Sequence, residues 1–422
     1  MHVARLPDCL RAEIALLRER GSAGSHSDRL NRAQETVDRM RSMFGRFGIT
    51  RLADVTGLDR IGIPVWMAVR PNSKTLAVSQ GKGLDQPAAQ ASAVMEAAEL
   101  ATAELFPVPI RPSSVEALKS EGARALPFNN LLRRGERPVT ESEAMPWVEG
   151  FDLLRHAPAW IPADLITLDP AGKGEKPSRY WQTSDGLASG NVLLEAVVHG
   201  LLERIERDAT TLWNLRSDAD VLQRCVDPAS LEDEAVLDLA ERIDEAGFQL
   251  RLFDITSDIG VPVYFSTIAP IPTGREDLWK HFDLSSGMGA HPSPARAAIR
   301  AITEAAQSRV TSITGARDDF DPYLYGHQLK ADLTAYLRAE PRGRPLTDLA
   351  DVPSPANNLA FILQRLTDAG VGSAIVVPLA GMGEPGFAVA RALIPELEYP
   401  PGDRRQRFGK RALKFMMGAQ AQ

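Results

Sequence analysis

Polar and apolar positions follow a helical period along residues 191–208. Five polar residues recur at intervals of three or four, which places them on one side of a helix with 3.6 residues per turn: Asn191, Glu195, His199, Glu203 and Glu206. The other sides carry mostly leucine, isoleucine and valine, so the pattern predicts a buried helix with a polar stripe. Carboxylates on a buried helix repel one another and lose their hydration unless cations lie between them. We therefore interpret the stripe as a face that binds divalent metal.

A solvated helix surface is the ordinary explanation for glutamates spaced in this way, because charged residues are mostly exposed. Two further segments favour the metal-binding interpretation. Residues 88–99 and 296–307 align with residues 195–206 without a gap, and each of the three segments follows a stretch that contains glycine and is expected to be a loop. The aligned polar columns are Glu96, Glu203 and Glu304; Glu99, Glu206 and Gln307; and Ser92, His199 and Arg300.

A unit of helix, glycine, two strands and proline begins at residue 33. Residues 33–47 predict a helix that ends near Gly48, and residues 51–55 and 63–69 predict strands, the second closed by Pro71. The order returns at residues 246–263, and a weaker third copy covers residues 369–395. We predict an α+β or mixed α/β fold with an internally duplicated core and buried helices that carry glutamate.

The ends of the chain differ from its middle. Residues 8–20 predict an amphipathic helix and residues 21–27 a Gly/Ser linker. We divide the chain into an N-terminal helical extension and linker at 1–30, a main domain at 31–400 and a basic tail at 401–422. A solvated helix is the ordinary interpretation of that tail, and contact with an acidic partner or peptide is the alternative.

Two internal regions show little periodicity. Residues 105–180 are rich in proline, arginine and glycine, so we expect them to be mostly irregular. Residues 317–355 contain several aspartates and prolines and are expected to form another connection.

Composition narrows the function. The chain has 422 residues, 44% of them apolar and 24% charged, and can therefore bury a large core. Its net charge of −7 argues against a general nucleic-acid-binding protein. Cys9 and Cys225 form neither a disulfide framework nor a metal-binding pair. With no apolar run of about 20 residues and no signal segment, we expect a cytoplasmic protein without membrane contact.

The search for familiar phosphate-binding and hydrolase motifs is negative. The sequence contains no P-loop, no H-E-x-x-H and no G-x-S-x-G. Gly81–Lys82–Gly83 is the nearest to a phosphate cradle, although a plain loop is the commoner interpretation of such glycines. Beside glutamate-bearing helices it suggests Mg²⁺ that bridges polyphosphate oxygens.

Three motifs occur in a fixed order with wide separations. They are Gly81–Lys82–Gly83 followed by Ser92-x-x-x-Glu96-x-x-Glu99; Thr183–Ser184–Asp185–Gly186 followed by Gly190–Asn191-x-x-x-Glu195, Glu203, Glu206 and Arg207; and Gly287-x-Gly289 followed by Arg300, Glu304 and Gln307. In this order they resemble the YcaO family, and the similarity covers about residues 45–395. Asp185 departs from the asparagine expected in the second loop.

The resemblance implies that the protein binds ATP and Mg²⁺ without a P-loop. By matched position, the Mg²⁺ ligands are Glu96, Glu99, Glu195, Glu203, Glu206 and Glu304. The residues matched to nucleotide binding are Lys82, Ser92, Asn191, Arg207, Arg300 and Gln307, and those matched to catalysis are Glu203, Arg207 and Arg300.

The chemistry implied by the resemblance is activation of a peptide backbone amide. The amide oxygen takes the γ-phosphoryl group of ATP, and phosphate leaves as a new bond forms. Members that make azolines often have a proline-rich C-terminus, a pattern that residues 414–422 lack. Similar bacterial proteins accompany a TfuA-type partner and introduce sulfur, so we expect a thioamide in a ribosomally made peptide.

Other functions remain open at this point. An azoline-forming cyclodehydratase uses the same scaffold, and an accessory protein could present a substrate peptide without catalysis. A metal-dependent hydrolase without ATP is less favoured, because no placed histidine or cysteine accompanies the glutamates. The expected partners are a substrate peptide, a TfuA-like protein and a second copy of the chain.

Overall fold

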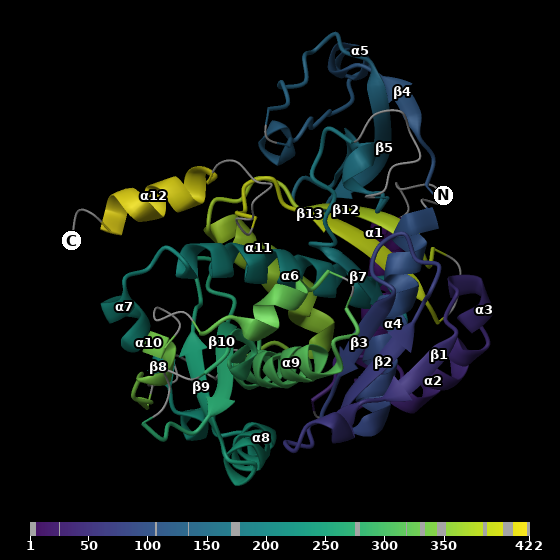
Figure 1. Ribbon diagram of the computed structural model, residues 1–422. Helices are drawn as coiled ribbons and strands as arrows, with labels where there is room; N and C mark the ends of the chain where they lie inside the picture. Colours follow the sequence, from purple (N-terminus) through teal and green to yellow (C-terminus); the bar gives the residue numbers. More distant parts are fainter. Residues whose placement is uncertain are drawn as a thin grey trace.

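The computed structural model describes residues 6–24, 26–105, 108–133, 135–169, 178–274, 279–317, 319–329, 334–343, 352–382, 386–399 and 408–419 (Figure 1). The helices are α1 Leu6–Arg20, α2 Ala33–Arg41, α3 Phe44–Phe47, α4 Gln86–Leu105, α5 Val115–Ser120, α6 Leu193–Trp213, α7 Asp218–Leu222, α8 Glu234–Glu245, α9 Pro294–Thr314, α10 Thr334–Leu337, α11 Asn358–Asp368 and α12 Lys410–Ala419. The strands are β1 Arg51–Asp54, β2 Val65–Val69, β3 Val78–Lys82, β4 Arg111–Ser113, β5 Met145–Asp152, β6 Ala157–Pro162, β7 Leu187–Gly190, β8 Cys225–Val226, β9 Phe248–Asp254, β10 Val263–Pro270, β11 Ser285–Ala290, β12 Ile375–Ala380 and β13 Ala388–Leu393.

Three antiparallel sheets surround the long helices, and the predicted mixed α/β class is confirmed. The sheets have the strand orders β1-β2-β3, β11-β10-β9-β8 and β4-β5-β12-β13-β7, with β6 paired to β5. Helix α4 packs on β2 and β3, α9 on β10 and β11, and α6 on β7 and β13. Each helix also contacts a strand of another unit: α4 contacts β7, α6 contacts β11 and α9 contacts β3, with α6 and α9 near the centre of the view (Figure 1). Their polar faces can therefore approach one another.

The turns before β2 and β10 are built in the same way. The N–H of Thr56 donates to Asp54 at 2.9 Å, and that of Thr256 donates to Asp254 at 2.8 Å. Each threonine hydroxyl then accepts an N–H from the first residue of the following strand, at 3.1 Å in both turns. In each unit three antiparallel strands lead to a long helix, α4 or α9.

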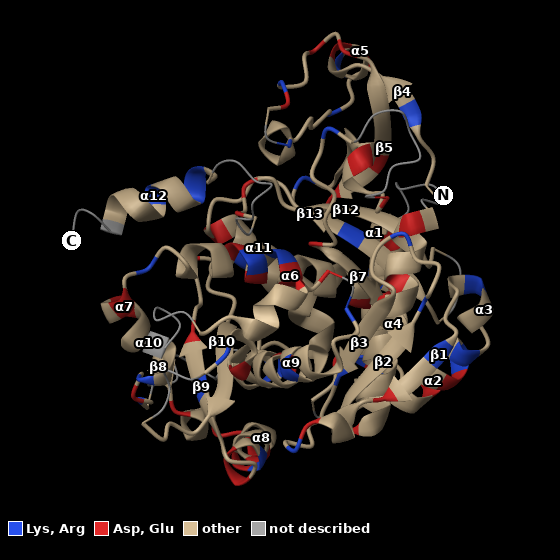
Figure 2. Ribbon diagram, in the orientation of Figure 1, with Lys and Arg blue, Asp and Glu red and all other residues tan. Residues whose placement is uncertain are grey.

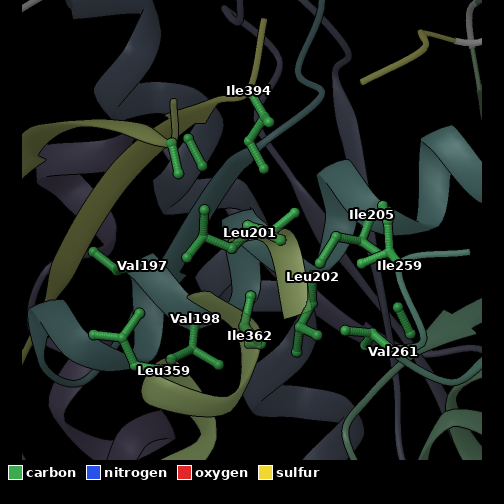
Figure 3. Packing of buried hydrophobic residues seen from close by; sticks show 14 of the residues in the cluster. Val197, Val198, Leu201, Leu202, Ile205, Ile259, Val261, Leu359, Ile362 and Ile394 are labelled. Carbon is green, nitrogen blue, oxygen red and sulfur yellow. The ribbon is translucent and has the colours of Figure 1, made fainter. Parts of the chain in front are cut away.

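The core around α6 contains its predicted apolar side. Figure 3 shows Val197, Leu201 and Ile205 of α6 in one cluster with Leu359 and Ile362 of α11. All five side chains are buried. At about 1.5–3 kcal/mol for each buried aliphatic side chain, this packing holds α6 firmly in place.

Glycines allow strands β3, β7 and β11 to touch the backbones of the long helices. A Cβ atom at Gly81 would lie 2.0 Å from the N atom of Ala93 in α4, and one at Gly287 would lie 2.3 Å from the O atom of Ala301 in α9. The glycine-containing stretches 79–83 and 285–289 are therefore mainly strand, and their prediction as loops was wrong. Close packing against a helix, rather than a turn, requires glycine there.

The prediction of mostly irregular structure for residues 105–180 was also wrong. Strand β5 pairs with β4, β6 and β12, and Trp147 and Phe151 from it are buried. Pro146 and Gly150 interrupt its apolar pattern, and β12 lies more than 200 residues away in the sequence. A local pattern could not reveal that pairing.

The N-terminal extension and the tail both contact the main body. Leu10 and Leu17 of α1 are buried in the core that contains α6. Arg411 of α12 pairs with Asp208 of α6 at 2.9 Å, and Asp208 is fully buried. Helix α12 is otherwise mostly exposed, as expected for a solvated helix, and among its described residues only Ala412 is buried. Arg404, Arg405 and Arg407 of that tail lie outside the described residues.

Other predicted elements shift by small amounts. The helix expected at 33–47 divides into α2 and α3, and Gly48 ends α3 in the left-handed region with φ 69°. Between residues 317 and 355 the structure describes α10 and single turns, whereas Asp318 and residues 344–351 lie outside the described part. Within the described ranges, no helix combines the length and apolar character needed to cross a membrane.

Candidate functional site

Five of the six predicted metal-binding glutamates converge from three helices. The carboxylates of Glu96 and Glu99 on α4, Glu203 and Glu206 on α6 and Glu304 on α9 alter one another's pKa through their charges, and we call them the glutamate cluster. Contacts of α4 with β7, of α6 with β11 and of α9 with β3 bring the three helices into this arrangement. Figure 2 shows acidic and basic positions side by side on α6, within the body of the molecule.

Backbone donors fix four carboxylates of the glutamate cluster. Each accepts one N–H group from a strand or from the loop before it, so that the sheets also orient these side chains. The pairs are Glu96 with Gln80 N at 3.1 Å, Glu203 with Gly186 N at 3.0 Å, Glu206 with Ala290 N at 3.1 Å and Glu304 with Met288 N at 3.3 Å.

Burial disfavours the fully ionised form of the glutamate cluster. Burial raises the pKa of Glu96 and of Glu203 to about 7. The pKa of Glu99 rises well above its usual value, first through burial and then through Glu203 and Glu96. Burial and the charge of Glu304 likewise raise the pKa of Glu206. Near neutral pH Glu96, Glu99 and Glu203 therefore carry protons for part of the time, and a bound cation would displace them.

Two basic side chains partly compensate the glutamate cluster. Lys82 pairs with Glu304, and burial, which would raise the pKa of Glu304, is outweighed by Lys82 and Arg207, so that this pKa falls below its usual value. Arg207 lies 3.4 Å from Glu203, 3.8 Å from Glu206 and 3.3 Å from Asp185. Asp185 thus anchors Arg207 from the second loop.

The donor chemistry of the glutamate cluster fits Mg²⁺. Carboxylate oxygens are hard ligands, and buried carboxylates with raised pKa values gain most from a divalent cation. In the described part of the chain, no three acidic, histidine or cysteine side chains are close enough to enclose a metal ion. The site is therefore a set of oriented carboxylates that a cation would have to draw together.

Glu195 lies apart from the glutamate cluster, near the start of α6. Its carboxylate accepts hydrogen bonds from Arg29 Nη1 at 3.1 Å, from Leu30 N at 2.8 Å and from the N–H of Asn191 at 2.8 Å. Asn191 also accepts a hydrogen bond from Thr36 at 2.8 Å. The segment 26–30, predicted as the end of a linker, thus holds this end of the site.

A cavity of about 200 Å³ lies between segment 26–30 and the starts of α6 and α9. Arg300 Nη2 donates to His199 Nε2 at 3.0 Å inside it. Burial and the charge of Arg300 hold the pKa of His199 well below its usual value, so the imidazole is neutral. Arg300 Nε and His199 Nδ1 are buried without hydrogen-bond partners. These donors suit an acceptor ligand in the cavity.

Gln307 and Ser92 are the remaining residues predicted to bind nucleotide. Gln307 Nε2 donates to the backbone oxygen of Gln80 at 3.2 Å and so ties α9 to β3. Ser92 is half-buried on α4, one turn before Glu96.

Sequence reasoning missed two groups that build the site. Glu13 of α1 accepts the N–H groups of Leu193 and Leu194 at 3.2 and 2.6 Å, and so caps α6 from another helix. Asp28 pairs with His291 at 2.6 Å and with Arg296, which holds segment 26–30 against α9. No local pattern marks either residue, because both partners are distant in the sequence.

Comparisons with known proteins identify the family of this arrangement. A family model described as YcaO cyclodehydratase, ATP- and Mg²⁺-binding, matches residues 80–398. A protein in the tfuA 3′ region of Rhizobium leguminosarum bv. trifolii is 37% identical over 412 residues, which are 96% of this chain and 97% of that protein. A protein of Methanothermobacter thermautotrophicus is 32% identical over 87% of this chain and 94% of its own length.

Solved structures share the fold. The YcaO protein of Methanopyrus kandleri bound with AMPPCP and Mg²⁺ has a TM-score of 0.66 at 22% identity, over 90% of this chain and 97% of that one. A heterocyclase in complex with substrate and cofactor has a TM-score of 0.70 at 20% identity and covers 92% of this chain. The present chain spans about half of that heterocyclase, 55% of its length.

Proposed function

The chain belongs to the YcaO family, whose cofactors are ATP and Mg²⁺, and on this premise we propose that it converts a backbone amide of a peptide into a thioamide. The glutamate cluster carries the proposal. Five carboxylates, one buried and four half-buried, have two basic side chains among them and form a site that needs further positive charge. Bound Mg²⁺ would supply that charge and could in turn hold a polyphosphate.

The proposed reaction balances without an oxidant. ATP supplies the γ-phosphoryl group that makes the amide oxygen a leaving group. Hydrosulfide then adds to the amide carbon through sulfur, the C–O bond breaks, and the products are thioamide, ADP and hydrogen phosphate. Phosphoryl transfer of this kind depends on positioning and neutralisation of charge more than on a protein nucleophile.

We assign roles to residues according to their place. The glutamate cluster holds Mg²⁺. Glu195, near the start of α6, also contributes to Mg²⁺ binding, directly or through water. Arg207 and Arg300 neutralise phosphate charge. The nucleotide contacts proposed from the motifs are Lys82, Ser92, Asn191, Arg207, Arg300 and Gln307. Arg300 fits this role best, since its Nε atom is buried without a partner.

The tfuA neighbourhood of the Rhizobium relative supports sulfur introduction and a TfuA-like partner. An azoline product is the second candidate, favoured by the description of the family model as cyclodehydratase. A non-catalytic accessory protein that presents a peptide is the third. These functions differ in product, so mass spectrometry separates them.

The test is coexpression of the chain with a TfuA-like protein and a candidate substrate peptide. A mass gain from exchange of oxygen for sulfur supports the proposal, whereas loss of water supports azoline formation. An unmodified peptide with intact ATP and Mg²⁺ binding favours the accessory role and contradicts catalysis.

A matched pair of variants tests the site. Glu203→Gln should remain folded, because Arg207 keeps Asp185 and Glu206 as partners, yet should release ADP at least about 100-fold more slowly, the usual cost of losing transition-state stabilisation. Glu241→Gln on α8, an exposed position, is the control and should release ADP at the normal rate. Equal rates in both variants would remove Glu203 from the mechanism.

A further inference from the structure

Arg391 of β13 is a buried guanidinium whose donors are only partly used. Arg391 is 2% exposed, and its Nη2 atom donates to the backbone oxygen of Thr183. Nε and Nη1 are buried and have no hydrogen-bond partner. Among the described residues, no carboxylate forms an ion pair with it within 4.0 Å. The charges of Asp185 and Glu203 act on it from beyond ion-pair distance and partly offset the cost of burying it, whereas Nε and Nη1 remain without an acceptor.

A second cavity, of about 40 Å³, lies against Arg391. Leu131, Leu165 and Leu393 give it apolar walls, Asp185 adds one carboxylate, and Trp181, Thr183 and Tyr399 complete the lining. A water molecule needs about 10–15 Å³ of such volume, so the cavity has room for about three water-sized groups. It is separate from the 200 Å³ cavity, which lies between segment 26–30 and the starts of α6 and α9.

The small cavity adjoins the glutamate cluster through one residue pair. Asp185, on the cavity wall, is 3.3 Å from Arg207, which in turn is 3.4 Å from Glu203. A ligand at Arg391 would therefore lie near the glutamate cluster, with Asp185 and Arg207 between them.

We propose that Arg391 binds a small monoanion in this cavity, and that in the reaction this anion is hydrosulfide. The identity of the anion rests on the proposed thioamide function, whereas the site itself rests on the unused donors and the cavity. Hydrosulfide is compact and polarisable, so it tolerates the leucine walls on one side and accepts from the guanidinium on the other.

The wall of the cavity disfavours the product phosphate. Burial would raise the pKa of Asp185, but Arg204 and Arg207 lower it below its usual value, so Asp185 is ionised. A dianion is repelled by this carboxylate about twice as strongly as a monoanion. One guanidinium beside one carboxylate therefore accommodates a single added negative charge better than two.

Direct binding to the full-length protein tests the site. Sodium hydrosulfide, sodium bromide and sodium phosphate are titrated anaerobically into the protein by calorimetry, at a mildly alkaline pH where hydrosulfide is the main sulfide species. We expect hydrosulfide and bromide to bind and phosphate not to compete with them. Competition by phosphate at Arg391, or failure of hydrosulfide to bind, would overturn the inference.

Three variants assign the binding to Arg391. Arg391→Met should weaken hydrosulfide binding at least about tenfold, the effect of losing charge-assisted hydrogen bonds. Arg391→Lys keeps the positive charge but lacks the planar guanidinium with its fixed set of N–H donors. It should therefore remain folded and still bind hydrosulfide more weakly than the wild type. Arg365→Met on α11, an exposed position, is the matched control and should bind normally. Unchanged binding in Arg391→Lys and Arg391→Met would exclude this site.

Product analysis separates the inference from the proposed function. If the wild type binds hydrosulfide through Arg391 and yields an azoline, the thioamide proposal fails and hydrosulfide is excluded as its reactant. If thioamide forms and Arg391→Lys raises the KM for hydrosulfide while the KM for ATP is unchanged, both stand. A thioamide formed with unaltered hydrosulfide KM in that variant leaves the function intact and refutes the site.

Discussion

Replacement of Glu203 by glutamine should stabilise the metal-free protein at alkaline pH and leave it unchanged at acidic pH. Burial raises the pKa of Glu203 from 4.5 to about 7 in the folded chain. A carboxyl whose pKa is higher in the folded state binds more protons there than in the unfolded state. The free energy of unfolding therefore falls as pH rises from about 4.5 to 7, and the loss is complete above 7.

The size of the effect follows from that pKa. A rise of about 2.5 in pKa, at about 1.4 kcal/mol for each unit, is about 3 kcal/mol. Glutamine removes the charge but can still accept the N–H of Gly186, and Arg207 retains two other carboxylates. We therefore expect Glu203→Gln to gain about 3 kcal/mol at pH 8 and almost nothing at pH 4.5.

Urea unfolding at the two pH values measures this gain, with a chelator in one series and Mg²⁺ with ATP in the other. The bound cation should remove the advantage of the variant, because it stabilises the ionised glutamate. Glu241→Gln should show no pH-dependent difference from the wild type. A variant that is destabilised equally at pH 4.5 and pH 8 would refute the reasoning, as would an advantage that persists with Mg²⁺.

Three further predictions concern the scaffold. Glu13→Ala should lower the free energy of unfolding by about 1–2 kcal/mol in urea titrations, because the first N–H groups of α6 lose their acceptor, whereas the exposed Glu19→Ala should change it little. Gly287→Ala should lower the thermal midpoint strongly, since its Cβ would meet backbone atoms of α9 at 2.3 Å; a normal midpoint would show that β11 can move. Arg411→Ala should cost about 3–5 kcal/mol and release α12 to proteolysis, because it leaves the fully buried Asp208 unpaired; protection equal to the wild type would contradict this role.

The polar columns shared by the three aligned helical segments could be recognised without a structure. The period that places Glu203 and Glu206 on one side of a helix is local, and the aligned columns add Glu96 and Glu304 without any knowledge of packing. The apolar side of α6 was predictable for the same reason. The coupling of these carboxylates through their charges is consistent with the alignment.

Pairings between distant segments could not be recognised in this way. Glu195 shares the helical stripe of α6, yet Arg29 and Leu30 engage it at a place apart from the glutamate cluster. Strand β5 was missed because its hydrogen bonds go to β12. Lys82, interpreted as part of a phosphate cradle, lies at the end of a strand and pairs with Glu304.

The order of residues by itself determined the three long helices, their polar columns and the mixed α/β class, since helical and strand periods depend on neighbours within a few turns. Tertiary structure decided which polar residues meet. It alone placed segment 26–30 over the start of α6, required glycine where β3 and β11 touch helices, and buried the guanidinium of Arg391 beside a small cavity. Each of these depends on contacts between residues far apart in the chain, and their energies act only once the helices and sheets have packed.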